Sequence, residues 1–374
     1  MSRSVVISGT GLWKPAHVIT NEELVNSYNA FADKYNETHS EQITKGEIVA
    51  KPHSSVEFIE KASGIKSRYI YMKKGALDID RMMPNIPKRS DEQLSDQAEM
   101  AVEAAKKAMD NAGKVPSDID AVIVSCAYTQ RSYPAIAIEV QHALGINGFG
   151  FDMLVACSAA TFGLHRAYEM VKAGTANCVL VINPELTSPQ VNYKDRDSHF
   201  IFGDVSVATI VENADQCQSR HSYEILSTRA LTRFSNNIRS NFGYLISANN
   251  DHPLMADQLF HQKGRSVFKE VCPMAAKHIT DHLEMHVLTP ERVKRWWLHQ
   301  ANINMNRLIC KLLLDRQPDE LEAPIVLDEF ANTASAGSLI AFNLFHEDLE
   351  KGDYGLICSF GAGYSIGSLV LRKR

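Results

Sequence analysis

The sequence predicts an α/β protein that is built from two similar halves. Apolar strand-like runs alternate with helical stretches along the chain, which is the pattern of βαβ units and of sheets covered by helices. The same succession of helix, strand, loop, helix and strand occurs twice, as an internal duplication would produce. The length of 374 residues suits two domains or one large one, and 45% hydrophobic and 22% charged residues are ordinary for a globular chain.

In the first half, the alanine-rich stretch 96–111 has helical spacing and leads through a polar turn into the apolar run 121–126. Cys157 lies 31 residues beyond the end of that run, at the junction between another apolar run and a helical stretch. The run 178–182 follows and has the composition of a buried strand.

The second half repeats this order. Residues 267–285 have helical spacing and precede the strand-like run 296–299, which ends at His299. Asn332 lies 33 residues beyond His299, and a buried strand predicted at 355–359 follows after a further helical stretch.

We expect the N-terminal half to span residues 1–215 and the C-terminal half to span residues 216–374, packed as one unit. Segments outside the repeat are polar and irregular, and long loops in compact domains often form lids or binding segments. These segments are 29–53, 72–89, 186–198 and 234–264.

Composition and charge exclude several classes of function. A net charge of −5 and a pI near 6.3 provide no overall positive field for nucleic acid or anionic membranes. No apolar run approaches the roughly 20 residues of a membrane-spanning helix, and no signal-peptide core is found, so a cytoplasmic protein is expected. Seven dispersed cysteines without a C-x-x-C pair indicate reduced thiols, and the 14 scattered histidines show no metal-site spacing.

Cys157 is the strongest candidate nucleophile. It lies where an apolar strand meets a helix whose first turn is built from small residues. The partial positive charge at a helix N-terminus favours thiolate, and such sites lower a cysteine pKa from about 8.5 to roughly 3.5–7.5. A reactive thiol is therefore predicted, with a small buried core residue as the alternative.

In the repeat, His299 corresponds to the strand end at Cys126, and Asn332 corresponds to Cys157 at the start of a helix. Both would lie on the loop side of their sheet, where the edges of the two halves can face each other. We therefore expect Cys157, His299 and Asn332 to converge. The glycine turn at 361–363 is followed by a strand and not by a helix, which argues against a dinucleotide site. Its backbone N–H groups are suited to bind an oxyanion.

Eight short motifs occur in the order found in one enzyme family. They are ISGTG at 7–11, SGIKSR at 63–68, YPA at 133–135, ACSA at 156–159, FGD at 202–204, HQAN at 299–302, NTASAG at 332–337 and GAG at 361–363. With them, the chain resembles β-ketoacyl-acyl carrier protein synthase III of the thiolase superfamily over nearly its whole length. The resemblance implies a five-layered αβαβα fold, a homodimer, and a condensation that uses no metal or redox cofactor.

The resemblance also implies roles for residues of this chain. Cys157 would take an acyl group from acyl-CoA, and His299 and Asn332 would bind the thioester oxygen of malonyl-acyl carrier protein while carbon dioxide leaves. The backbone N–H groups of Cys157 and Ala362 would hold the oxyanion. The implied substrate-binding residues are Phe58, Arg196, Phe202, Asn302 and Phe360, and the implied carrier-protein docking residues are Arg307 and Lys311.

The chain departs from the short-chain members of this family at several positions. Phe58 stands where they have a tryptophan that stacks on the adenine of CoA, and Ala62 and Asn304 replace family arginines. The segments 29–53 and 72–89 lengthen the chain near the expected acyl and CoA entrance. In these respects the chain resembles the longer subclass that uses medium-chain acyl-CoA.

Other functions remain as alternatives. A degradative thiolase needs a second cysteine where Ser359 stands, and a chain-elongating synthase needs a second histidine where Asn332 stands. A hydroxymethylglutaryl-CoA synthase needs a glutamate partner that the sequence does not reveal. Condensing enzymes of secondary metabolism, which form alkylquinolones or polyketides, share the Cys, His and Asn set and stay open, as does a non-catalytic acyl-binding scaffold.

Overall fold

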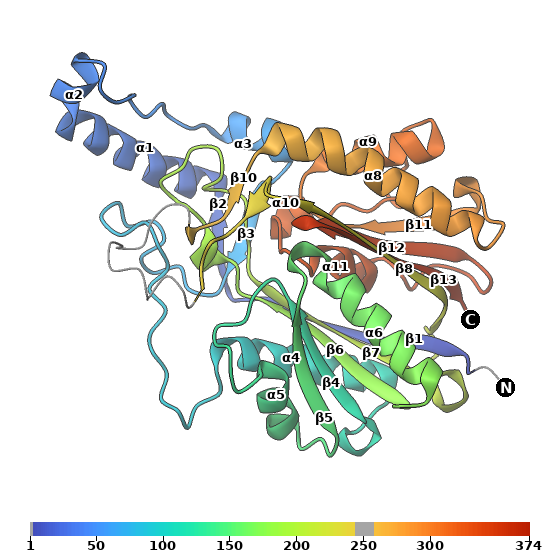
Figure 1. Ribbon diagram of the computed structural model, residues 1–374. Coiled ribbons are helices and arrows are strands. Elements are labelled where there is room, and N and C mark those ends of the chain that lie inside the picture. The colour runs from blue at the N-terminus through green and yellow to red at the C-terminus, as the bar shows by residue number, and fades with distance from the viewer. Residues whose placement is uncertain (1–2, 244–257) are drawn as a thin grey trace.

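The structure is a computed structural model that describes residues 3–243 and 258–374 (Figure 1). In this part of the chain, nine strands join in the order β11-β12-β13-β8-β1-β7-β6-β4-β5. The strands of the N-terminal half are β1 (Val5–Trp13), β4 (Ala121–Cys126), β5 (Phe149–Leu154), β6 (Cys178–Glu185) and β7 (Val205–Asn213). Those of the C-terminal half are β8 (Tyr223–Ser235), β11 (Val293–Leu298), β12 (Tyr354–Gly361) and β13 (Gly363–Lys373).

The strand directions show the duplication. β4 runs parallel to β5 and β6, and β11 runs parallel to β12, while the remaining pairs are antiparallel. The two sets of strands meet where Val6 and Ile7 of β1 lie opposite Glu224 and Tyr223 of β8. This short pairing joins the two halves, and the boundary near residue 215 stays a prediction.

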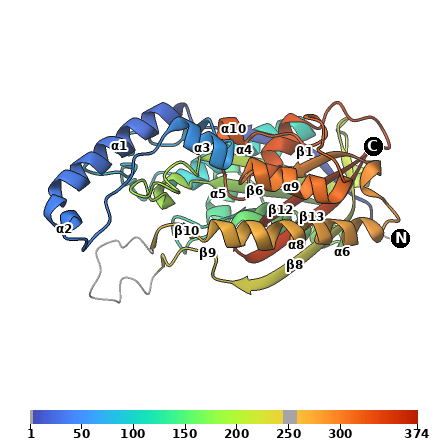
Figure 2. The same cartoon turned by 90° about the horizontal axis from the view of Figure 1, so that it is seen from above.

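Helices cover the strands so that the molecule has five layers (Figures 1 and 2). The helices on the outer face of the N-terminal strands are α4 (Asp96–Ala112) and α5 (Ile136–Leu144). The middle layer consists of α6 (Ala159–Ala173) and α11 (Gly337–Leu344). The helices over the C-terminal strands are α8 (Gly264–Glu284) and α9 (Ile303–Leu314). The predicted αβαβα fold is therefore confirmed.

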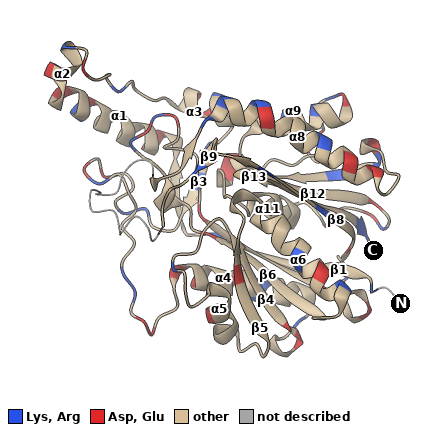
Figure 3. Ribbon diagram, in the orientation of Figure 1, with Lys and Arg blue, Asp and Glu red and all other residues tan. Residues whose placement is uncertain are grey.

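Residue size and polarity explain how closely the layers pack. β4 and β6 are buried along their whole length, as expected for continuous apolar strands that are covered on both faces. α4 approaches β1 so closely that a Cβ added at Gly9 would lie 2.6 Å from the backbone oxygen of Ala108. The alanines of α4 are therefore the residues that fit against this strand. Charged residues lie mainly on the outer helices and loops (Figure 3).

One sequence-based expectation is wrong, because the first part of the segment 29–53 is helical. Helix α1 (Asn21–Thr38) runs into this segment, and a short helix α2 (Ser40–Thr44) follows, so that an arm projects from the body (Figures 1 and 2). A capping box starts α1, and buried side chains recur every four residues from Leu24 to Ala32. Polar residues lie between these buried positions, so the apolar stripe is too narrow to indicate a helix from the sequence alone.

Short elements close the end of the molecule near the arm. They are β2 (His17–Thr20), α3 (Val56–Ser63), β3 (Ser67–Ile70), β9 (Ile238–Arg239), β10 (His261–Gln262) and α10 (Leu327–Phe330). The segment 72–89 contains no helix or strand, as predicted. Part of the predicted loop 234–264 lies outside the described residues, and its described ends include the paired strands β9 and β10.

Candidate active site

Cys157 lies in a tight turn between β5 and α6. Ala156 precedes it with a φ of +45°, a left-handed conformation that is strained for a residue other than glycine. Gly361 packs directly against the cysteine, because an added Cβ there would lie 2.5 Å from the Cβ of Cys157. The backbone N–H groups of Ala362 and of Cys157 itself lie close enough to the thiol to act against the rise in its pKa. The turn after β5, from the N-terminal half, and the turn between β12 and β13, from the C-terminal half, therefore lie next to the sulfur.

The predicted lowering of the Cys157 pKa is wrong. Burial, reinforced by the nearby Glu185 carboxylate, raises the pKa of Cys157 to about 12 against the opposing effect of the two N–H groups. Loss of hydration disfavours the thiolate more than the start of the helix favours it. Cys157 is therefore a protonated thiol at neutral pH, although part of its surface stays open.

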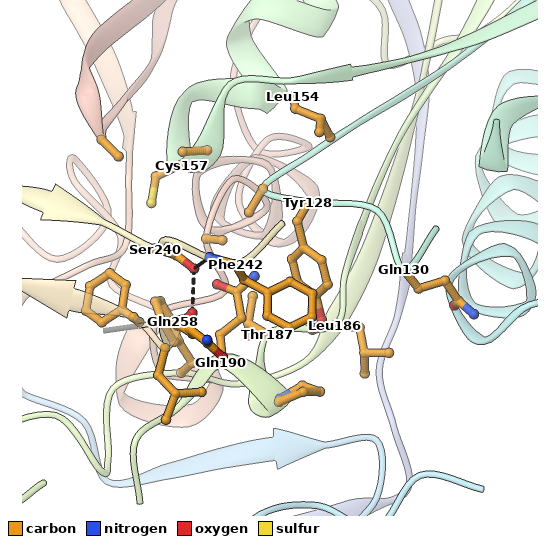
Figure 4. Close-up of a pocket in the computed structure, with 18 of the residues that line it drawn as sticks. Tyr128, Gln130, Leu154, Cys157, Leu186, Thr187, Gln190, Ser240, Phe242 and Gln258 are labelled. Atoms are coloured by element: carbon orange, nitrogen blue, oxygen red, sulfur yellow. Dashed lines mark hydrogen bonds between the residues drawn. The ribbon is translucent and has the colours of Figure 1, made fainter. Parts of the chain in front are cut away.

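A cavity of about 600 Å³ opens beside Cys157 (Figure 4). Ala334, from the loop that follows Asn332, and Ala362 also line it. Most of the wall is apolar or aromatic and is formed by Met83, Ile86, Tyr128, Leu154, Leu186, Pro189, Phe202, Ile238, Phe242, Leu259 and Phe260. Cavities of roughly 300–1,000 Å³ with such walls hold small organic ligands, so this one suits an apolar chain attached at the cysteine.

His299 is a buried, neutral imidazole at the end of β11. Its backbone N–H donates to the Cys358 carbonyl oxygen over 2.8 Å, and its ring lies edge-on to Phe360 with the ring centres 5.2 Å apart. Burial lowers the pKa of His299 to about 3. Its Nδ1 atom has no hydrogen-bond partner among the described residues. The ring is therefore uncharged at neutral pH and keeps hydrogen-bonding capacity for a ligand.

Asn332 is held by its own backbone. Its N–H donates to Ile201 over 3.0 Å, and its carbonyl oxygen accepts from Gly203 over 3.1 Å. The side-chain Oδ1 accepts from the N–H of Ala334 over 3.0 Å. The amide oxygen is thus occupied inside the loop, which leaves the Nδ2 end as the donor.

The three candidate catalytic residues approach the cavity in different ways. Cys157 lines it directly, whereas His299 and Asn332 are not among its lining residues. Asn332 is bridged to Phe202, which lines the cavity, and is followed by Ala334, which also lines it. His299 contacts Phe360, which precedes the turn next to Cys157. Asn332 is therefore next to residues of the cavity wall, and His299 is next to the residue that precedes the 361–363 turn, while convergence of the three residues stays a prediction.

The other expected substrate residues lie outside this cavity, with one exception. Phe202 lines the wall, but Phe58 and Arg196 stack on each other instead, with the guanidinium 3.7 Å from the ring centre. Asn302 accepts a hydrogen bond from the Asn304 N–H at the start of α9 and donates to the Ala62 carbonyl oxygen over 2.7 Å, which is a capping role. The remaining positions are Phe360, which is buried against His299, and Arg307 and Lys311, which are exposed on α9.

A second cavity, of about 710 Å³, is polar. Its lining includes four cationic side chains and two carboxylates, namely Lys51, Lys194, Arg239 and Arg265 with Asp195 and Asp197. Arg239 also lines the Cys157 cavity, so the two cavities share a wall. This arrangement places an excess of positive charge next to the apolar cavity.

Sequence reasoning missed one buried residue of the site. Glu185 ends β6 and is fully buried, and its carboxylate accepts hydrogen bonds from Ala127 and Ser335. Its only signal in the sequence is an acidic residue three positions beyond the apolar run 178–182. Within the described ranges, no group of three or more metal-binding side chains occurs, and no helix is long and apolar enough to cross a membrane.

Comparisons with known proteins agree on one family. The family model described as 3-oxoacyl-[acyl-carrier-protein] synthase III matches residues 151–230, and the model of its C-terminal part matches residues 283–373. The β-ketodecanoyl-[acyl-carrier-protein] synthase of Pseudomonas aeruginosa is 53% identical over 349 residues, which cover 93% of this chain and 100% of that protein. The β-ketoacyl-[acyl-carrier-protein] synthase III of Granulibacter bethesdensis is 27% identical over 382 residues, with both chains fully covered.

A solved structure gives the same result for the fold. The crystal structure of 3-oxoacyl-[acyl-carrier-protein] synthase III from Aquifex aeolicus matches with a TM-score of 0.76 at 25% identity. The match covers 98% of this chain and 99% of that chain. The likeness therefore extends over both halves of the molecule.

Proposed function

Because the chain belongs to the 3-oxoacyl-acyl carrier protein synthase III family, we propose that it joins a medium-chain acyl-CoA to malonyl-acyl carrier protein with loss of carbon dioxide. The product is a β-ketoacyl-acyl carrier protein of fatty acid synthesis. One observation carries the proposal, namely the apolar cavity that opens directly on Cys157. The relative that is 53% identical is named for a ten-carbon ketoacyl product, which corresponds to octanoyl-CoA extended by two carbons.

In the first half-reaction, the Cys157 sulfur attacks the thioester carbonyl of acyl-CoA. The C–S bond to CoA breaks, and the thiol proton of Cys157 ends on the leaving CoA sulfur, so no net proton is exchanged. Negative charge develops on the carbonyl oxygen next to Cys157. The N–H groups of Cys157 and Ala362 point to this region and would stabilise that charge.

In the second half-reaction, malonyl-acyl carrier protein loses carbon dioxide, and negative charge moves to its thioester oxygen. His299 and Asn332 would donate hydrogen bonds to this oxygen, because the neutral imidazole carries one N–H and the Asn332 amide has its Nδ2 end available as a donor. The resulting enolate carbon attacks the acyl-Cys157 thioester. Cys157 leaves as a thiolate and takes up a proton, which regenerates the thiol.

The cavity supports a chain longer than acetyl. Each buried methylene contributes up to about 0.8 kcal/mol, so six more methylenes in octanoyl than in acetyl give a ceiling of roughly 5 kcal/mol. Met83 and Ile86 come from the segment 72–89 and form part of the wall. This contact supports a role for that segment in chain-length selection.

The polar cavity supports binding of the phosphorylated end of the substrate. Lys51, Lys194, Arg239 and Arg265 outnumber the two carboxylates, and Asp197 already pairs with Arg196 at 3.5 Å. CoA and the carrier protein both present phosphate groups at the end of a pantetheine chain, which suits this charge. Docking of the carrier protein at Arg307 and Lys311 and assembly as a homodimer are further parts of the proposal.

A reconstituted condensation assay tests the function. The protein is mixed with malonyl-acyl carrier protein and a series of acyl-CoA esters, and the products are identified by mass. We expect β-ketodecanoyl-acyl carrier protein from octanoyl-CoA, with the highest kcat/KM of the series. A highest kcat/KM for acetyl-CoA would refute the medium-chain assignment, and the absence of any condensation product would refute the function.

A further inference from the structure

Glu185 joins three segments behind the wall of the Cys157 cavity. Its Oε1 and Oε2 atoms accept from the Ala127 N–H over 3.1 and 3.2 Å. Its Oε1 atom also accepts from the Ser335 N–H over 3.2 Å and from the Ser335 hydroxyl. Glu185 itself ends β6 and is fully buried. A single carboxylate thus connects the ends of two N-terminal strands to a loop of the C-terminal half.

Each of these contacts is next to a residue that lines the cavity. Ala127 lines the cavity itself, Leu186 follows Glu185, and Ala334 precedes Ser335. Asn332 lies three residues before Ser335, and its Oδ1 accepts from the Ala334 N–H. The Glu185 to Ser335 bonds therefore fix the same short loop that orients the Asn332 amide.

The surroundings of Glu185 are unusual for a structural carboxylate. The titratable groups that interact with it electrostatically are Asp204, Cys126, Tyr128 and Cys157, and none of these described groups is a cation. Burial raises the pKa of Glu185 to about 7 in spite of its hydrogen bonds. A buried charge without a cation is costly, and perturbed carboxyls of this kind concentrate at functional sites.

We propose that Glu185 is a positioning residue for the decarboxylation half-reaction and that it holds the Asn332 loop in place against the cavity of Cys157. The inference rests on the proposed function for the identity of the reaction. Glu185 does not contact the reacting atoms in this arrangement. It acts through Ser335 and the Asn332 amide.

Two substitutions separate the effect of the Glu185 hydrogen bonds from the effect of its negative charge. Glu185→Gln keeps an oxygen that can accept from Ala127 and Ser335 but removes the negative charge. Glu185→Ala removes all the acceptors. Glu212→Gln is the matched control, because Glu212 is also fully buried but pairs with Lys114 away from the cavity. Circular dichroism confirms that each variant is folded.

The expected readout is carbon dioxide release from malonyl-acyl carrier protein. Glu185→Ala lowers the kcat of carbon dioxide release at least tenfold, with KM changed less than twofold. The kcat of Glu185→Gln and of Glu212→Gln stays within threefold of that of the unmodified protein at pH 7. The unmodified protein slows as pH rises from 6 to 8, because ionised Glu185 opposes the negative charge of the enolate. Glu185→Gln shows no such slope.

The possible outcomes are distinct. A folded Glu185→Ala variant with unmodified kcat overturns the proposal, and so does an equal loss in Glu212→Gln. If the unmodified protein releases no carbon dioxide, the proposed function fails, and the alkylation of Cys157 by iodoacetamide then decides whether Glu185 acts on the site. The Glu185 charge raises the pKa of Cys157, so Glu185→Gln should shift the pH profile of alkylation to lower pH. An unchanged profile overturns the proposed effect of Glu185 on the site.

Discussion

In the proposed mechanism, single residues of the site stabilise negative charge at two separate places. The N–H groups of Cys157 and Ala362 lie next to the sulfur, and the carbonyl oxygen that gains negative charge during acyl transfer would be bound beside it. His299 and Asn332 come from other loops, and in the proposed mechanism they donate to the malonyl thioester oxygen. Each half-reaction therefore depends on its own donors, and substitutions can separate the two steps.

Asn332→Ala removes a donor that only decarboxylation needs. We expect carbon dioxide release to slow by about 10²–10³-fold, the usual effect of losing one such donor, while acylation of Cys157 stays nearly unchanged. Cys157→Ala does the reverse, abolishing acylation but retaining some carbon dioxide release. Single-turnover acylation by mass and carbon dioxide release are measured on both variants. Asn343→Ala is the control, because Asn343 lies in α11 and does not line the cavity. Equal loss of both steps in folded Asn332→Ala would make Asn332 a structural loop residue.

Burial of His299 predicts a pH dependence of stability. Its pKa falls from 6.5 to about 3 in the folded protein, so the unfolded chain binds more protons between these values. The His299 contribution is therefore complete above pH 6.5 and is lost as pH falls toward 3, by about 1.4 kcal/mol per unit. From pH 7 to pH 5, the free energy of unfolding should fall about 2 kcal/mol further in the unmodified protein than in His299→Gln. Urea unfolding at both pH values measures this difference, and equal losses would contradict it.

At the scale of elements, the β12 to β13 turn must approach the start of α6 closely. Gly361→Ala places a Cβ 2.5 Å from the Cβ of Cys157, so the turn has to shift and the Ala362 N–H moves away from the sulfur. We expect acylation by octanoyl-CoA to fall at least about tenfold, since an oxyanion donor is displaced. Gly243→Ala is the control, because an added Cβ there meets no atom of the described residues within 4 Å. Unchanged acylation in Gly361→Ala would show that this N–H is not needed.

Met83 and Ile86 of the segment 72–89 line the Cys157 cavity. A substitution there should therefore change the acyl chain length that the protein prefers. Ile86→Trp fills part of the cavity, and overfilling such a space typically costs about 1–3 kcal/mol. The kcat/KM for octanoyl-CoA should therefore fall roughly 5- to 150-fold while that for acetyl-CoA changes little. Lys88→Trp, at an exposed position of the same segment, is the control. If both esters lose activity equally, Ile86 does not select chain length.

Elements that depend on local pattern could be predicted, and those that depend on tertiary contacts could not. Continuous apolar runs identified β4 and β6, and the strand-to-helix junction located Cys157. The stacking of Arg196 on Phe58 and the capping role of Asn302 depend on distant segments. The sequence pattern shows the helix start beside the thiol, but the desolvation that raises the Cys157 pKa exists only in the folded structure.

At the scale of the whole molecule, the duplication assembles the site from both halves. The N-terminal half supplies Cys157 and Glu185, and the C-terminal half supplies His299, Asn332 and the 361–363 turn. The turn of Cys157, the loop after Asn332 and the 361–363 turn all contribute residues to one cavity. A site divided in this way depends on the packing of the two sets of strands against the middle helices.

The central claim is that Cys157 carries the acyl group. The most direct measurement treats the protein with octanoyl-CoA, digests it and locates the added mass by peptide mapping. The account predicts one octanoyl adduct, on the peptide that contains Cys157, and none after Cys157→Ala. An adduct found only on Cys126 or Cys358 would contradict it.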